Sequence, residues 1–74
     1  MLSGEVFRKK REEAGLSQSQ AAQALFVSQP YLSGVEAGGK LPTVGLVGLA
    51  AKLYGCTTDE LIYGEAPGGR EEGA

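Results

Sequence analysis

Residues 17–38, SQSQAAQALFVSQPYLSGVEAG, have the pattern of two short helices in succession. Ser17 and Gln20 fit a capping box, in which each side chain bonds the other residue's backbone at a helix start. Ser28 can cap the second helix by accepting from free backbone N–H groups, and Gly38 can end it. Each helix therefore carries its own local start signal.

The apolar positions in this stretch predict how the two helices pack. Ala22 is small enough for a second helix to approach closely. Leu32 and Val35 are three residues apart, so they lie on one face of the second helix and can be buried against the first. This pattern predicts a helix-turn-helix, with helices over about 18–25 and 29–37.

The rest of the chain extends this pattern to an all-α domain of five helices. A first helix is expected over about 4–14, with Ser3 as a possible cap. A fourth should follow Thr43 and run to Tyr54, and a short fifth should follow a second capping box that begins at Thr57. The valines are dispersed at helical spacing, so no strand is expected.

Length and composition predict one small domain. The 74 residues, 42% of them hydrophobic, are enough for one compact core, expected over residues 1–64. Residues 65–74, EAPGGREEGA, are rich in glycine and charge and predict a flexible C-terminal tail. With one cysteine, no secretory pattern and no membrane-length apolar run, we expect a cytoplasmic protein without membrane contact.

The residue types present argue against an enzyme. The chain has no histidine and one cysteine, so neither a histidine-based triad nor an ordinary zinc site can be assembled. Its paired acids are neighbours in sequence and diverge on a helix, so they do not converge on one substrate. No metal, cofactor or small-molecule ligand is expected.

Three motifs, in order and at the right spacing, link the chain to a known family. They are RKKREEAGLSQSQAAQAL, then VSQPYLSGVEAG, then Pro42 and LAAKLYGCTTDELI. Together they resemble the Cro/CI-type, or XRE, helix-turn-helix family. The resemblance implies a compact five-helix lambda-repressor-like domain that binds double-stranded operator DNA, usually as a homodimer. We therefore expect a transcriptional regulator, most simply a dimeric repressor.

The resemblance also implies which residues meet DNA. The helix that starts at Gln29 would enter the major groove, where a glutamine amide can pair with N6 and N7 of adenine. Gln18 would brace Gln29 or approach the DNA backbone, and Arg11 and Glu36 would form a structural ion pair between helices. The expected DNA-binding residues are Gln18, Ser28, Gln29, Pro30, Tyr31, Ser33, Gly34 and Lys40.

Each of these roles has a simpler alternative. Gln29 could be a solvated helix start, Gln18 could complete only a local cap, and Lys40 could be a solvated loop lysine. The segment 28–38 has no basic residue, and the chain carries a net charge of −2. A helix-turn-helix module that binds a protein partner and has lost DNA binding is therefore the alternative function.

The predicted fourth helix is apolar on more than one side. We expect an inward stripe formed by Leu46, Leu49, Ala50 and Leu53. The remaining apolar residues would then face outward, and they would expose more apolar surface than a monomer requires. They predict a dimer interface formed by Val47, Tyr54, Ile62 and Tyr63, although Tyr63 could instead fold back over Tyr54.

One residue departs from the family pattern. Phe26 stands in the predicted turn, where the family usually has glycine because φ is often positive there. We expect either a re-formed turn or about 1 kcal/mol of backbone strain, tolerated because the ring packs on a neighbour.

Overall fold

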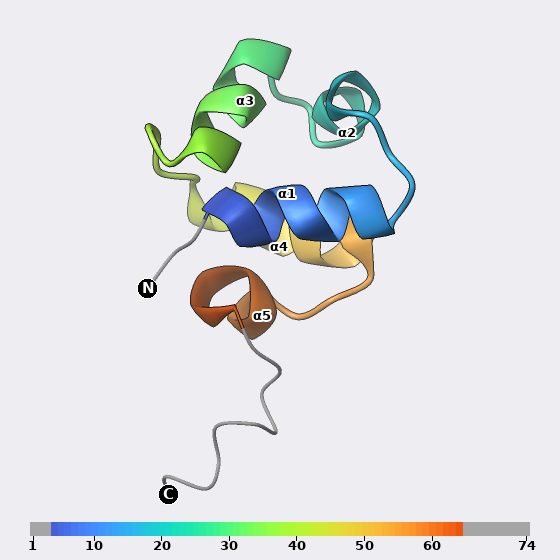
Figure 1. Ribbon diagram of the computed structural model, residues 1–74, viewed down its shortest axis with the longest axis vertical. Coiled ribbons are helices and arrows are strands. Elements are labelled where there is room, and N and C mark those ends of the chain that lie inside the picture. Colours follow the sequence, from blue (N-terminus) through green and yellow to red (C-terminus); the bar gives the residue numbers. More distant parts are fainter. Residues whose placement is uncertain (1–3, 65–74) are drawn as a thin grey trace, which may run out of the picture.

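The computed structural model describes residues 4–64, and this part of the chain is entirely helical apart from its turns and loops. The prediction of an all-α, five-helix domain is confirmed (Figure 1). The helices are α1 (Gly4–Glu13), α2 (Gln18–Ala24), α3 (Gln29–Ala37), α4 (Val44–Tyr54) and α5 (Thr58–Tyr63). The expected cap at Ser3 and the expected tail, 65–74, lie outside the described residues.

Local signals start and stop these helices as predicted. Both capping boxes form, with Ser17 and Gln20 at the start of α2 and Thr57 and Glu60 at the start of α5. At the end of α3, Gly38 has a φ of 86°, a left-handed conformation that glycine adopts without steric cost.

Helix α1 is the centre of the fold. In Figure 1, α2 and α3 lie on one side of it, and α4 and α5 lie behind and below. One core joins the helices on the two sides of α1. Its largest fully buried side chains come from α1, α3 and α5 and are Phe7, Leu32, Val35 and Leu61. The domain that presents α3 is therefore a single packed unit.

The orientation of α4 agrees with the prediction in part, since Leu46 and Ala50 of the expected inward stripe are buried. Val47 and Tyr54, expected on the surface, are each only 8% exposed and belong to the core, whereas Leu49 is 44% exposed. The helix is apolar on several sides, so hydrophobic spacing did not define one inward face. The assignment of Val47 and Tyr54 to a dimer interface is therefore wrong, because the fold of a single chain already buries them.

The last predicted interface residues lie on α5. Ile62 is partly buried and packs against the core, whereas Tyr63 is half exposed. Tyr63 therefore keeps accessible surface for a second chain, and Ile62 keeps less.

The turn between α2 and α3 keeps the family geometry despite its phenylalanine. Phe26 has a φ of 60°, the left-handed conformation expected for glycine at this place. Its ring is 86% exposed, so the expected packing on a neighbour is absent. The strain of about 1–2 kcal/mol is therefore compensated elsewhere in the fold, not by contacts of the ring.

No helix within residues 4–64 is both long and apolar enough to cross a membrane.

Candidate nucleic-acid interface

The two helices of the predicted motif meet through small and apolar residues. Ala21 and Ala22 of α2 are buried, and the N–H of Val27 donates to the carbonyl oxygen of Ala22 at 3.0 Å. Leu32 and Val35 of α3 are buried as the sequence predicted. The N-terminus of α3 is thereby presented at the surface next to the N-terminus of α2.

A buried ion pair ties α3 to α1. Arg11 donates from Nε and Nη2 to the two carboxylate oxygens of Glu36, at 2.8 and 3.0 Å. Its Nη1 donates to the carbonyl oxygen of Leu16 at 3.0 Å. The hydrogen bonds to Glu36 raise the pKa of Arg11 against the opposing effect of burial. This two-pronged pair holds α3 at a defined position relative to α1.

The same carboxylate reaches the surface through two amides. Gln18 donates from Nε2 to Glu36 Oε1 at 3.1 Å, and Gln29 donates from Nε2 to Gln18 Oε1 at 3.4 Å. A carboxylate only accepts, so the nitrogen of Gln18 must face Glu36 and its oxygen must face Gln29. The network therefore runs from a buried charge to the exposed first residue of α3.

This network leaves one donor and one acceptor of the Gln29 amide free to bind a partner. One N–H of its amide is used by Gln18, so its Oε1 and its second N–H are available. One acceptor and one donor side by side are what the major-groove edge of adenine requires. Pro30 and Ser33 are also exposed on α3, as predicted.

Two predicted contact residues have partners within the chain. Ser28 caps α3 by accepting from the backbone N–H of Tyr31 at 3.2 Å. The hydroxyl of Tyr31 donates to the carbonyl oxygen of Leu41 at 2.9 Å. The hydroxyl hydrogen of Tyr31 is therefore not available to a DNA phosphate in this structure, because it already forms this bond.

Gly34 makes room for a lysine. A Cβ added at Gly34 would lie 3.0 Å from Cγ of Lys40, so the lysine stem crosses the helix at this point. The backbone N–H groups of Gly39 and Lys40 both donate to the carbonyl oxygen of Gly34, at 2.9 and 3.2 Å. The loop thus places the stem of Lys40 over α3 at Gly34. Gly34 was expected to meet DNA, but here the lysine covers it.

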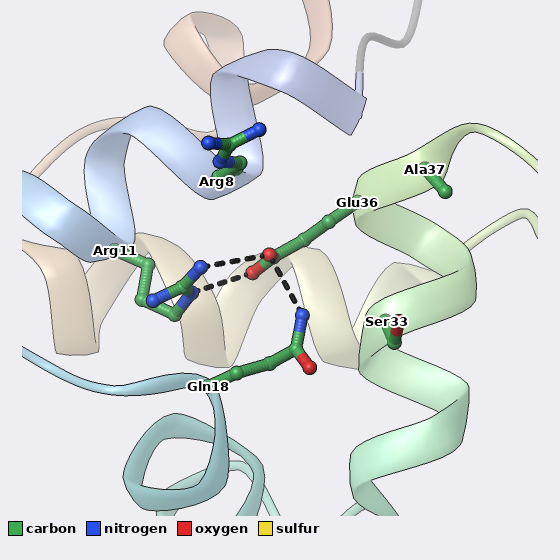
Figure 2. Close-up of a pocket in the computed structure, with 6 residues that line it drawn as sticks. All are labelled: Arg8, Arg11, Gln18, Ser33, Glu36 and Ala37. Atoms are coloured by element: carbon green, nitrogen blue, oxygen red, sulfur yellow. Dashed lines mark hydrogen bonds and ion pairs between the residues drawn. The ribbon is translucent and has the colours of Figure 1, made fainter.

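The sequence analysis did not include Arg8 among the expected DNA-binding residues. It lines a surface pocket of about 250 Å³ together with Arg11, Gln18, Ser33, Glu36 and Ala37 (Figure 2). In the sequence Arg8 belonged to a run of basic residues, which by default is a solvated helix face. The i, i+3 spacing of Arg8 and Arg11, which puts both on one face of α1, was the available signal.

Comparison with known proteins agrees with this geometry. The helix-turn-helix family HTH_3 matches residues 7–61. No curated protein matches the chain. The P22 c2 repressor in complex with a synthetic operator superposes with a TM-score of 0.80 at 25% identity, over 88% of this chain and 98% of that chain.

Two further solved structures are similar. The restriction-modification controller protein C.AhdI from Aeromonas hydrophila has a TM-score of 0.73 at 27% identity, over 80% of this chain and 89% of that chain. A chain of the SinR/SinI complex has a TM-score of 0.78 at 22% identity, which speaks for the fold alone. That match covers 84% of this chain and 61% of the other. The match to residues 7–61, most of the chain, shows that this protein belongs to the Cro/CI-type helix-turn-helix family.

Proposed function

We propose that the protein is a sequence-specific DNA-binding regulator of transcription that acts as a dimeric repressor and places α3 in the major groove. Membership of the family and its repressor and controller neighbours support a DNA-binding transcriptional regulator. The finer assignment rests on one observation, the oriented amide of Gln29 at the exposed start of α3.

The charge distribution suits base reading by neutral groups. Residues 29–37 contain no basic side chain, so Gln29, Pro30 and Ser33 would contact bases and sugars without a charge of their own. Lys40, held over Gly34, would lie against the phosphate backbone. Few cations imply a shallow dependence of affinity on salt, because the slope is about −0.9 for each phosphate neutralised.

A dimer would align two α3 helices with two half-sites one helical turn apart. The half-exposed ring of Tyr63 on α5, next to Ile62, supports an interface at this end of the domain. Sedimentation of the wild type and Tyr63→Ser over a range of concentrations tests it. A shift of the variant toward monomer supports the interface, and a monomeric wild type at all concentrations contradicts it.

Selection of bound duplexes from a random pool tests the function itself. We expect an enriched sequence with two related half-sites. Gln29→Ala should weaken binding to the selected sequence by roughly tenfold, because one bidentate hydrogen-bonded contact from a side chain to a base contributes about 1–3 kcal/mol. Binding to unrelated duplexes should change little. Equal loss on all sequences would argue against base reading.

The second candidate function is a protein-binding module. The large exposure of Phe26, Leu41 and Val44 favours it, because three exposed apolar side chains could meet an apolar partner. This alternative predicts no duplex binding even at low salt, and a stable complex with another protein. Titration of the wild type with labelled duplex at about 50 mM salt separates the two functions.

A further inference from the structure

The pocket between α1, α2 and α3 has one side chain whose charge is not neutralised inside it. Figure 2 shows Arg8 on α1 across from Ser33 and Ala37 on α3, with the Arg11–Glu36 pair between the two helices. The charges of Arg11 and Glu36 cancel within their buried pair. Arg8 therefore gives the pocket its net positive charge.

Arg8 is held only weakly. Its one described partner is Glu12, at 3.2 Å from Nε, and both side chains are more than half exposed. Such an i, i+4 pair contributes about 0.3–0.5 kcal/mol, so an incoming anion can replace it. The terminal nitrogens of Arg8, with four N–H groups, make no hydrogen bond to any described residue.

We propose that this pocket, defined by its six lining residues and named here the Arg8 pocket, binds one phosphodiester of DNA. Arg8 would bind the phosphate oxygens after leaving Glu12, and the hydroxyl of Ser33 would donate from the opposite wall. The inference rests on the proposed function and adds a backbone-binding residue to it. Glu12 then acts as a competitor that the phosphate must displace.

The dimensions of the groove favour DNA as the source of the phosphate. A helix with its side chains is about 10–12 Å across, and the major groove is about 12 Å wide. A strand of the backbone must therefore pass along each flank of α3. The Arg8 pocket lies on the flank that faces α1, and the pocket holds room for several waters or one phosphate group.

The test compares the salt dependence of duplex binding for the wild type and Arg8→Gln. We expect the slope of log affinity against log salt to become shallower by about 0.9, equally for selected and unrelated duplexes. Lys9→Gln is the matched control, because this substitution removes the same charge from α1 and Lys9 does not line the pocket. An unchanged slope for Arg8→Gln, or an equal change for Lys9→Gln, would overturn the proposal.

Glu12 provides a second, opposite test. Glu12→Gln should strengthen duplex binding about twofold by freeing Arg8, and this gain should vanish when Arg8→Gln is present. Glu13→Gln removes the same charge one residue away and controls for general repulsion. A gain that persists without Arg8 would contradict the role of Glu12 as competitor.

Free phosphate is the other source of the same chemistry. Inorganic phosphate is titrated against chloride at equal ionic strength while the backbone amide resonance of Ser33 is followed. Saturation by phosphate at millimolar concentration, with duplex binding unaffected by Arg8→Gln, would assign the pocket to a small anion and overturn the proposal. Failure of the proposed function differs, because the wild type would then bind no duplex at all.

Discussion

Gln18 donates to Glu36 at 3.1 Å, and this one bond orients the amide that Gln29 presents to solvent. The carboxylate of Glu36 has only acceptors, so it decides which end of the Gln18 amide faces outward. The outer end is the oxygen, which accepts from Gln29 at 3.4 Å. A buried ion pair and an exposed reading residue are thereby coupled through a single side chain.

Replacing Gln18 by methionine should remove this orientation without removing Gln29. We expect affinity for the selected DNA sequence to fall by about 1 kcal/mol, with little change on unrelated duplexes. The double variant with Gln29→Ala should bind like Gln29→Ala alone, because the bracing has nothing left to orient. Fully additive losses would show that Gln18 acts independently of Gln29. Duplex titration measures all four proteins.

Arg11→Met should destabilise the fold strongly. The variant leaves the carboxylate of Glu36 buried without its cation, which typically costs about 3–5 kcal/mol. Arg11→Met combined with Glu36→Leu should recover much of this loss, since no charge is then left buried. Urea unfolding is the measurement, and Arg8→Met, which breaks an exposed pair, should cost under about 0.5 kcal/mol. Equal effects of Arg11→Met and Arg8→Met would refute this account.

Phe26→Gly should raise the melting temperature. Relief of the positive φ contributes about 1–2 kcal/mol, and the greater freedom of glycine in the unfolded chain offsets up to about 1 kcal/mol of it. The exposed ring loses few contacts when it is removed. Ala24→Gly, at the exposed end of α2, should do the opposite because its backbone is helical. A lower melting temperature for Phe26→Gly would mean that the ring stabilises the turn.

Two glycines in helices should respond oppositely to alanine. A Cβ at Gly4 would lie 2.4 Å from the carbonyl oxygen of Val35 and 2.5 Å from that of Glu36, so α1 and α3 would have to move apart. A Cβ at Gly48 would meet no atom within 4 Å. We expect Gly4→Ala to cost at least about 1 kcal/mol and Gly48→Ala to add up to about 1 kcal/mol of stability. Denaturant unfolding of both variants gives the comparison, and the same sign for both would contradict the packing of α1 against α3.

Tyr54 should make the fold sensitive to alkaline pH. Its buried hydroxyl has no hydrogen-bond partner among the described residues, and burial raises its pKa to about 12. The unfolded chain releases this proton near pH 10, so stability should fall as the pH rises from about 10 to 12. Tyr54→Phe should lack this part of the loss and should be at least as stable at neutral pH, because no buried donor is left unpaired. A parallel alkaline loss in both proteins would assign the effect to other groups.

The sequence by itself determined where the helices start and stop. Ser17 with Gln20, Thr57 with Glu60, and Gly38 act within a few residues of themselves, so their effects hold before any tertiary contact forms. The positive φ at Phe26 is different, because it was one of two outcomes that the family resemblance left open for this turn.

Tertiary structure decided the rest. Helix α4 is apolar around much of its circumference, so only packing against the other helices could choose Val47 and Tyr54 as inward residues over Leu49. The hydroxyl of Tyr31 donates to the carbonyl oxygen of Leu41, and the stem of Lys40 lies over Gly34. Both contacts require the loop after α3 to fold back on the helix. The Arg8 pocket likewise exists only where three helices meet, because its walls come from α1, α2 and α3 and include a pair formed between residues 25 positions apart in the chain.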